Sequence, residues 1–300
     1  ATSTGRDHWV DQARRAEDAG YAVATMPDHF TDQLAPVPAL HSVLENTTTL
    51  RAGALVFDND YKHPLVLAKE LATMDVLSDG RVEIGLGAGW MVSDYEQSGI
   101  PYDPPGVRVS RFIEGLAVIK GALADEPFSF AGEHYTITDY DGRPKPVQSP
   151  PPVLIGGGGP RVLGFAAREA DNVGINATMT SGAIDASTFD SMTADAVDGK
   201  VELVRRVATE AGRLDDIEMN LRAFMVFVTD DVDQALGTLS EFTGAPEEVI
   251  ADSPFALVGP TDRIIELLHE RRERWGFSYV IVGQNDVEPF APVVAALAGT

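Results

Sequence analysis

The feature that most limits the fold of this chain is a regular alternation of short apolar strand patterns with longer amphipathic helix patterns. Strands that are separated by helices favour a parallel sheet with right-handed crossovers. The strand patterns cover residues 21–26, 50–57, 81–86, 153–155, 172–175, 218–229 and 278–282. The helix patterns cover residues 7–19, 37–45, 64–77, 109–123, 161–170, 201–211, 261–275 and 289–297.

This alternation predicts a (β/α)8 TIM barrel with insertions, folded as a single domain over residues 1–300. The series starts with a helix, and the preceding ATSTGR has no strand character, so we expect the first barrel strand to be missing from the numbered chain. Two insertions are expected. PFSFAGEHYTIT predicts a β-hairpin at about 126–143, and a polar segment without apolar periodicity predicts a mobile loop at about 177–199.

Composition narrows the possible partners and compartment. With 46 acidic and 23 basic residues the formal net charge is -23, which disfavours binding to nucleic acid or to anionic membranes. The chain has no cysteine, which excludes disulfides and thiolate chemistry. No apolar run is long enough to span a bilayer, and no signal peptide opens the sequence. We therefore expect a cytoplasmic protein that acts on a small molecule.

Four consecutive glycines, Gly156–Gly159, lie between a predicted strand and a predicted helix. The helix starts with Pro160 and Arg161, so the turn combines unobstructed main-chain N–H groups, a positive helix end and a cation. This combination indicates a phosphate site. A tight turn that merely needs positive φ is the simpler alternative, although one or two glycines would be enough for it.

Polar residues follow two other strands. Asp28 and His29 come directly after the strand at 21–26, where a histidine can act as an acid or base near neutral pH. A histidine that only bonds its own loop is an equal alternative. Asp58 and His63 could join Asp28 and His29 as metal ligands, but no metal-binding spacing supports this, and His63 before Pro64 is typical of a helix start.

The turn GLGAG (85–89) follows a further strand and has a superficial likeness to a dinucleotide-binding fingerprint. It lacks the last spaced glycine, and no acidic residue ends a second strand about 20 residues later. A Rossmann site is therefore not expected. A flat ligand lying close to this part of the main chain explains the glycines better.

Long stretches of the sequence resemble the luciferase-like monooxygenase superfamily, and in particular its branch that uses the deazaflavin coenzyme F420. The resemblance covers nearly the whole chain in order and is carried by PDHF (27–30), HPLVLAKELATMDVLSDGRVEIGLGAGW (63–90), PPGVRVSRFIEGLAVIK (104–120), FAGEHYTIT (130–138), KPVQSPPPVLIGGGGPRVLGFAAREAD (145–171) and TDRIIELLHE (261–270).

The resemblance implies a cofactor ring at the carboxyl ends of the strands and a cis peptide bond between Leu55 and Val56 that backs it. It implies that His29 lies beside the reactive carbon of the ring. We expect His29 and Asp28 to be the catalytic residues, with His29 moving the proton and Asp28 tuning it. The residues that it assigns to the cofactor are Leu55, Val56, Asp58, Gly87, Ala88 and Gly89 near the ring, and Gly157, Gly158, Gly159, Pro160 and Arg161 at the phosphate.

The same resemblance implies an F420-dependent hydride transfer to or from an alcohol, carbonyl, imine or activated alkene, in a homodimer. Sugar-phosphate dehydrogenases of the family pair the histidine with a glutamate in the loop after the fourth strand, where this chain has GAGW and no carboxylate. The alternatives are an FMN-dependent monooxygenase of the same fold, a metal-dependent barrel hydrolase and a non-catalytic cofactor-binding protein. Trp90, Met91 and Tyr95 could line an apolar wall or simply fill the core.

Overall fold

The computed structural model describes residues 5–299, which form two compact units. The N-terminal unit contains residues 5–14 and 22–155, and the C-terminal unit contains residues 15–21 and 156–299. The expected organisation as one domain stays a prediction. Residues 1–4 lie outside the described residues, so the expectation of a missing first strand is not tested there. The first described element is the helix α1 (Arg6–Asp18).

The N-terminal unit contains a parallel sheet in the order β1-β2-β4-β7, with the short β3 paired to β4. Met26 lies opposite Ala54, and Ile84 lies opposite Val153. The elements that follow α1 are β1 (Val23–Met26), α2 (Pro36–Asn46), β2 (Arg51–Ala54), β3 (Phe57–Asp58), α3 (Pro64–Leu77), β4 (Val82–Gly87), α4 (Val92–Ser98), α5 (Pro105–Leu123), β5 (Phe128–Ala131), β6 (Thr136–Tyr140) and β7 (Val153–Gly157).

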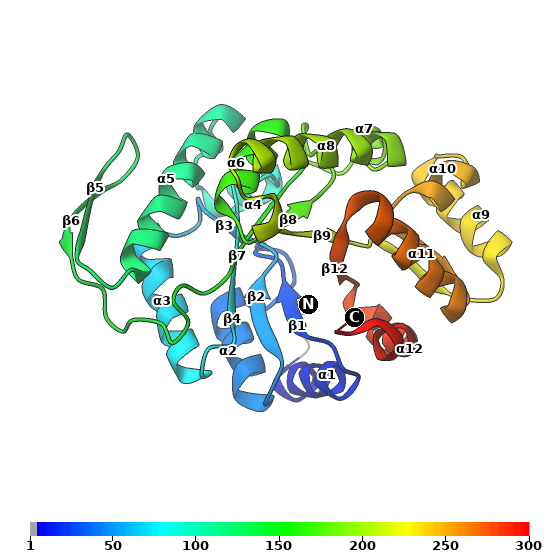
Figure 1. Cartoon of the computed structure of the whole chain (residues 1–300), viewed down its shortest axis with the longest axis horizontal. Helices are drawn as coiled ribbons and strands as arrows, with labels where there is room; N and C mark the ends of the chain where they lie inside the picture. The colour runs from blue at the N-terminus through cyan, green and yellow to red at the C-terminus, as the bar shows by residue number, and fades with distance from the viewer. Residues whose placement is uncertain (1–4, 300) are drawn as a thin grey trace. The chain divides into compact units, whose positions relative to one another are not determined.

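Helix α3 illustrates how local sequence sets an element. It begins at Pro64, which suits a first helical turn, and the His63 ring accepts a hydrogen bond from the Leu65 N–H at 3.2 Å. The predicted helix start at His63 is therefore confirmed. Helices α3 and α5 lie side by side (Figure 1) and bury Leu71 and Phe112. The predicted hairpin is also confirmed, as β5 and β6 pair in antiparallel fashion.

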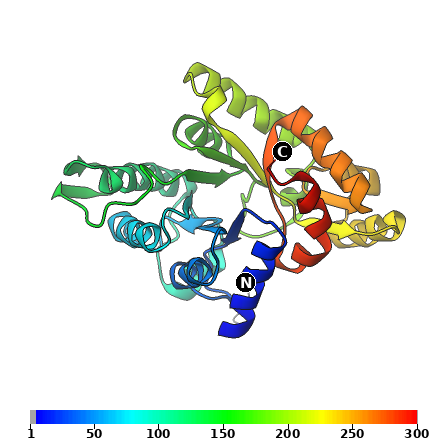
Figure 2. The same cartoon turned by 60° about the horizontal axis from the view of Figure 1, so that its bottom comes forward.

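The C-terminal unit contains parallel strands in the order β8-β9-β12 and a separate pair, β10 and β11. Helices α11 and α12 pack together (Figure 2) over a core that includes Leu257, Ile264 and Phe290. The elements are α6 (Pro160–Glu169), β8 (Asn172–Ile175), α7 (Ala186–Asp190), α8 (Ala194–Glu210), η1 (Leu214–Asp216), β9 (Glu218–Arg222), β10 (Met225–Val228), α9 (Val232–Thr243), α10 (Glu247–Asp252), β11 (Ala256–Gly259), α11 (Thr261–Trp275), β12 (Phe277–Ile281), η2 (Gln284–Asp286) and α12 (Val287–Leu297).

The single strand expected at residues 218–229 is wrong. The chain pairs with β12 as far as Ala223, whose N–H donates to the Ile281 carbonyl, and the Phe224 N–H then donates to the Phe255 carbonyl. The strand therefore changes partner and continues as β10 beside β11, a strand that the sequence did not predict. The end of the strand expected at residue 229 consequently does not lie in the main parallel sheet.

Two further boundaries differ from expectation. The strand expected at 50–57 is divided into β2 and β3, with Leu55 and Val56 between them. The segment expected as a loop at 177–199 contains α7 and the first turns of α8. Asp185 caps the N-terminus of α7, and Thr193 caps the N-terminus of α8. Mobility of the remainder stays a prediction. None of the helices in residues 5–299 is long and apolar enough to cross a membrane.

Candidate functional site

Three strand ends of the N-terminal unit place the predicted ring-site residues on one edge of its sheet. Asp28 and His29 follow β1, Leu55 and Val56 follow β2, and the turn Gly87–Gly89 ends β4. Because neighbouring strands are parallel, their carboxyl ends lie at the same edge. The predicted cis peptide bond between Leu55 and Val56 is confirmed. The sheet thus brings these residues to one edge, as the sequence predicts.

His29 is held by a carboxylate that the sequence analysis missed. Its Nδ1 lies 2.6 Å from Oδ2 of Asp94, which also accepts a hydrogen bond from the Tyr61 hydroxyl at 3.0 Å. The second oxygen of Asp94 accepts the N–H of Phe30 at 3.2 Å. The Asp94 side chain is 1% exposed and that of His29 is 19% exposed. The ring is thus fixed through Nδ1, while Nε2 has no hydrogen-bond partner among residues 5–299.

The expectation that no carboxylate follows the fourth strand for His29 is therefore wrong. GAGW itself supplies none, but Asp94 comes four residues after Trp90, in the first turn of α4. The polar and aromatic segment VSDYEQS was the available signal, and its short length gave no helical periodicity to read. Trp90 lies edge-on to the His29 ring, with 5.7 Å between ring centroids.

A second carboxyl cluster lies beside this pair. The Tyr95 hydroxyl donates to Asp58 Oδ2 and to Asp60 Oδ2, both at 3.1 Å, and the Asp60 N–H donates to Asp58 at 2.9 Å. Arg111 pairs with Asp60 at 2.9 Å and also with Asp103. Tyr95 is buried and hydrogen-bonded, so it belongs to the core rather than to an apolar pocket wall.

Burial raises the pKa of Asp58 to about 7, and the charge of Asp60 acts in the same direction. Hydrogen bonds from the Asp60 N–H and the Tyr95 hydroxyl oppose this shift. Burial also raises the pKa of Asp28, whose carboxylate accepts the Asp58 N–H at 3.3 Å. The hydrogen bond of the His29 ring is with Asp94, while a role for Asp28 beside His29 stays a prediction.

The carboxyl cluster explains why position 89 is a glycine. Its φ is 73°, and a Cβ at this position would lie 1.9 Å from the Tyr95 hydroxyl oxygen and 2.4 Å from Asp58 Oδ2. A side chain would thus break the hydrogen bond between Tyr95 and Asp58. The absence of a side chain at Gly89 is explained by the protein itself, and its proximity to a ligand stays a prediction.

The predicted phosphate site, from Gly157 to Arg161, lies in the C-terminal unit. A Cβ at Gly157 would lie 2.6 Å from Val162 Cγ1, and one at Gly158 would lie 2.2 Å from the Ala177 carbonyl oxygen. Close packing therefore explains why both positions are glycine. Gly159 has no atom within 4 Å of an added Cβ, and as the first residue flanking α6 it provides no side-chain cap. A side chain at Gly159 would therefore meet no protein atom, and the phosphate assignment stays a prediction.

Lys200 stabilises the loop beside this turn and was not singled out from sequence. Its Nζ donates to the carbonyls of Asn176 at 2.8 Å and Ser191 at 2.9 Å. The Asn176 N–H donates to the Gly157 carbonyl at 3.0 Å. Burial lowers the pKa of Lys200 to about 8. A half-buried cation is therefore linked to the glycine turn through the main chain of one loop.

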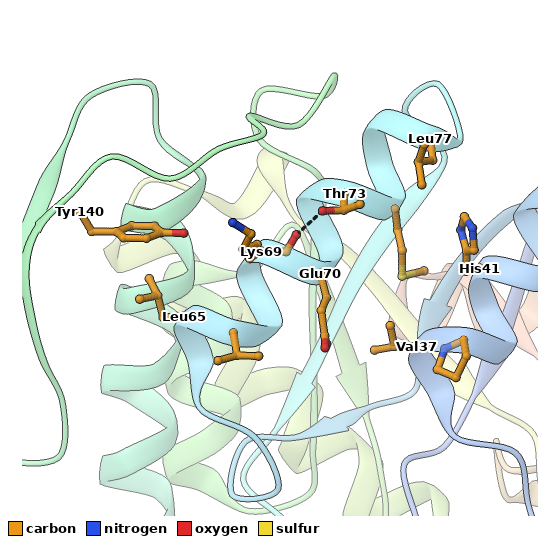
Figure 3. A pocket seen from close by; sticks show the side chains of 11 residues that line it. Val37, His41, Leu65, Lys69, Glu70, Thr73, Leu77 and Tyr140 are labelled. Carbon is orange, nitrogen blue, oxygen red and sulfur yellow. Dashed lines mark hydrogen bonds between the residues drawn. The ribbon is translucent and has the colours of Figure 1, made fainter.

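A groove of about 580 Å³ lies elsewhere in the N-terminal unit, between α2, α3 and Tyr140 of the hairpin. Figure 3 shows Val37 and His41 on one wall and Leu65, Lys69 and Thr73 on the other. None of the predicted site residues lines it. Among residues 5–299, no three His, Asp or Glu side chains are arranged to hold a metal ion.

Comparison with solved structures gives the fold class. An F420-dependent tetrahydromethanopterin reductase from Methanopyrus kandleri matches with a TM-score of 0.78 and 20% identity, over 98% of this chain and 96% of that one. The predicted α/β fold of luciferase-like barrels is thereby confirmed. The family follows from sequence: a model described as luciferase-like monooxygenase matches residues 1–275, so the chain belongs to that family.

Two characterised relatives give a narrower comparison. An FMNH2-dependent dimethylsulfone monooxygenase from Pseudomonas putida is 27% identical over 246 residues, which is 80% of this chain and 63% of the relative. An F420-dependent glucose-6-phosphate dehydrogenase from Amycolatopsis mediterranei is 32% identical over 173 residues, or 54% of this chain and 51% of the relative. The chain thus spans between half and two thirds of the length of these relatives.

Proposed function

We propose that the protein is an F420-dependent oxidoreductase that transfers hydride between the deazaflavin and a small organic substrate, such as an alcohol, carbonyl, imine or activated alkene. The observation that carries the proposal is His29, fixed by Asp94 at the strand ends with Nε2 free. Relatives and solved neighbours with F420 in their names support the choice of cofactor.

The bound cofactor would supply the carbon that gives or accepts hydride. In our proposal, His29 Nε2 transfers the proton that accompanies the hydride. It takes this proton from a substrate hydroxyl during oxidation and donates it to a carbonyl oxygen during reduction. Asp94 accepts a hydrogen bond from Nδ1–H, which leaves Nε2 as the basic atom, and its negative charge stabilises the ring when Nε2 is protonated. Asp94 is thus a positioning residue, and Asp28 remains a proposed auxiliary.

The residues present fit such a cofactor in two respects. Leu55, Val56 and Ala88 are half-buried apolar residues that follow β2 and β4, at the same edge of the sheet as His29. Gly159 leaves open space at the uncapped start of α6, a ten-residue helix with Pro160 and Arg161 in its first turn. We therefore keep the ring assignment for Leu55, Val56, Asp58, Gly87, Ala88 and Gly89, and the phosphate assignment for Gly157, Gly158, Gly159, Pro160 and Arg161.

The second candidate is an FMN-dependent monooxygenase, favoured by the dimethylsulfone monooxygenase that aligns with 80% of this chain. The metal-dependent hydrolase has no such support, because the chain belongs to the luciferase-like family.

Titration of the purified protein with F420 and with FMN, each oxidised and reduced, decides between the two. Absorbance and fluorescence report binding of either one. We expect F420 to bind with at least tenfold higher affinity than FMN. Tighter binding of reduced FMN, with oxygen uptake on mixing, would reverse the choice, and binding of neither would refute both.

A homodimer, a cytoplasmic location and the absence of nucleic-acid binding belong to the same proposal, since the family resemblance and the net charge of -23 support them. Sedimentation velocity tests the dimer directly. A monomer at micromolar concentration would contradict it.

A further inference from the structure

Arg222 is the last residue of β9, which lies between β8 and β12 in the C-terminal unit. Its guanidinium carbon lies 4.9 Å from the centre of the Phe224 ring, and Phe224 in turn stacks on Phe255 with an interplanar angle of 24°. The side chain is half-buried. Aromatic contacts thus hold one face of the guanidinium at the carboxyl edge of the sheet, where sites assemble in parallel folds of this class.

The N–H groups of Arg222 have no hydrogen-bond or ion-pair partner among residues 5–299. Two other arginines show the usual arrangement. Arg271 donates to the carbonyls of Pro254, Ser253 and Ala256, and Arg111 pairs with two carboxylates. Arg108 also stacks on a tyrosine with unpartnered nitrogens, but it is 5% exposed and so is closed to a ligand.

Asp286, at the end of η2 after β12, is the carboxylate whose charge acts on Arg222. It forms no ion pair with Arg222, and its Oδ2 accepts the Gly283 N–H at 3.1 Å instead. Burial lowers the pKa of Arg222 and raises that of Asp286, as expected for charged groups that have lost water without forming an ion pair with each other. A half-buried guanidinium of this kind costs folding free energy unless something else pairs with it.

We propose that Arg222 binds an anionic group of a small molecule, namely a carboxylate, sulfonate or phosphate. The planar fork of a guanidinium matches two oxygens of such a group, and the Phe224 face fixes the plane of the fork. Strand β8 lies between β7 and β9, so this position is about 10 Å, two strand spacings, from the glycine turn. Assigning the anion to a substrate rests on the proposed function, whereas anion binding itself does not.

The test compares wild-type protein with Arg222→Met, Arg222→Lys and the control Arg206→Met. Arg206 is an exposed residue of the same unit that pairs with Glu210, so the control makes the same charge change on the surface. Melting temperature and calorimetric Kd are measured with acetate, methanesulfonate and phosphate at constant ionic strength. We expect saturable binding to wild type and to Arg206→Met. A Kd at least tenfold weaker is expected for Arg222→Met, and an intermediate Kd for Arg222→Lys.

Without anion, Arg222→Met should melt no lower than wild type, because it removes an unpaired charge from an aromatic surface. Equal anion binding by all four proteins, or no binding by wild type, would overturn the proposal. Binding of F420 and of its deazariboflavin fragment without the phosphate distinguishes the sources. If Arg222→Met weakens F420 alone, the anion is the cofactor tail, and if it weakens neither while losing the small anions, the anion is a substrate group. Failure of F420 to bind refutes the proposed function and leaves the anion measurements valid.

Discussion

The carboxyl edges of the two units are built in different ways. In the N-terminal unit, side chains satisfy one another: Asp94 holds His29 and Tyr61, and Tyr95 joins Asp58 to Asp60. In the C-terminal unit, the comparable positions present open main chain at Gly159 and, at Arg222, a cation without a hydrogen-bond or ion-pair partner in the described part of the chain. Side chains that move protons must be held in place before substrate arrives, whereas anion sites need unoccupied donors.

The largest expected effect is a loss of turnover when His29 of the N-terminal unit is substituted. His29→Gln should lower kcat/KM by about 10²–10⁴-fold, because the proton-transfer group is lost. Cofactor affinity should change less than threefold. The measurement is steady-state turnover beside a cofactor titration. His8→Gln, on the exposed face of α1, is the matched control. Retained turnover in His29→Gln would remove the basis of the proposed mechanism.

The buried carboxyl of Asp58 should make stability depend on pH. Its pKa rises from 3.8 to about 7 on folding, so between these values the unfolded chain is ionised while the folded chain keeps the proton. The free energy of unfolding therefore falls as pH rises from about 4 to about 7, by about 1.4 kcal/mol per unit of pKa shift and several kcal/mol at most.

Urea unfolding of Asp58→Asn should lack most of this fall. Asp11→Asn, an exposed residue of α1, should keep the wild-type profile. Parallel profiles for wild type and Asp58→Asn would show that this carboxyl is ionised in the folded chain.

Gly89 and Gly99 form a natural pair for testing how tightly the cluster is built. Their φ angles are 73° and 75°, but an added Cβ meets Tyr95 and Asp58 only at Gly89 and nothing within 4 Å at Gly99. Gly99→Ala should cost about 1 kcal/mol for backbone conformation alone. Gly89→Ala should cost about 2 kcal/mol more, because it also separates a buried hydrogen bond. Equal losses in denaturant unfolding would mean that the cluster is loosely packed.

Asp94→Asn keeps the shape of the residue that positions His29 and removes its charge. We expect kcat to fall about 10- to 100-fold with little change in KM, because the His29 ring loses the carboxylate that orients it. Glu96→Gln removes the same charge from the exposed side of α4 and should change neither quantity. Asp94→Glu should restore part of the rate, an outcome that a purely structural role would not give.

The smallest effect is expected at the glycine turn. Gly159→Ala should leave stability within about 0.5 kcal/mol of wild type, since its Cβ meets open space. Affinity for F420 should fall several-fold relative to the fragment without phosphate. Gly158→Ala, whose Cβ would meet the Ala177 carbonyl, should instead destabilise the fold. Unchanged F420 affinity in Gly159→Ala would refute the assignment of the cofactor phosphate to this position.

Much of the fold could be predicted because its signals are local. Helices α3 and α11 begin and end where the apolar periodicity predicts, and His63 precedes α3 as expected for a helix start. The parallel order follows from the alternation of strands with helices. The positions of His29 and the cis bond at Leu55 were available from the family resemblance together with the strand ends. These features depend on residues that are close in sequence.

The partners of these residues depended on the tertiary structure. Asp94 reaches His29 across 65 positions of sequence, and nothing in VSDYEQS specifies which ring it will meet. The run from Glu218 to Val228 is uniformly strand-like, and only the separate partners β12 and β11 divide it at Ala223. The sequence by itself determined most of the helices and the ends of the strands β1 and β4, because propensity and periodicity are local. Which side chains pair was decided by packing between distant segments, because a hydrogen bond needs two groups that only the folded chain brings within reach.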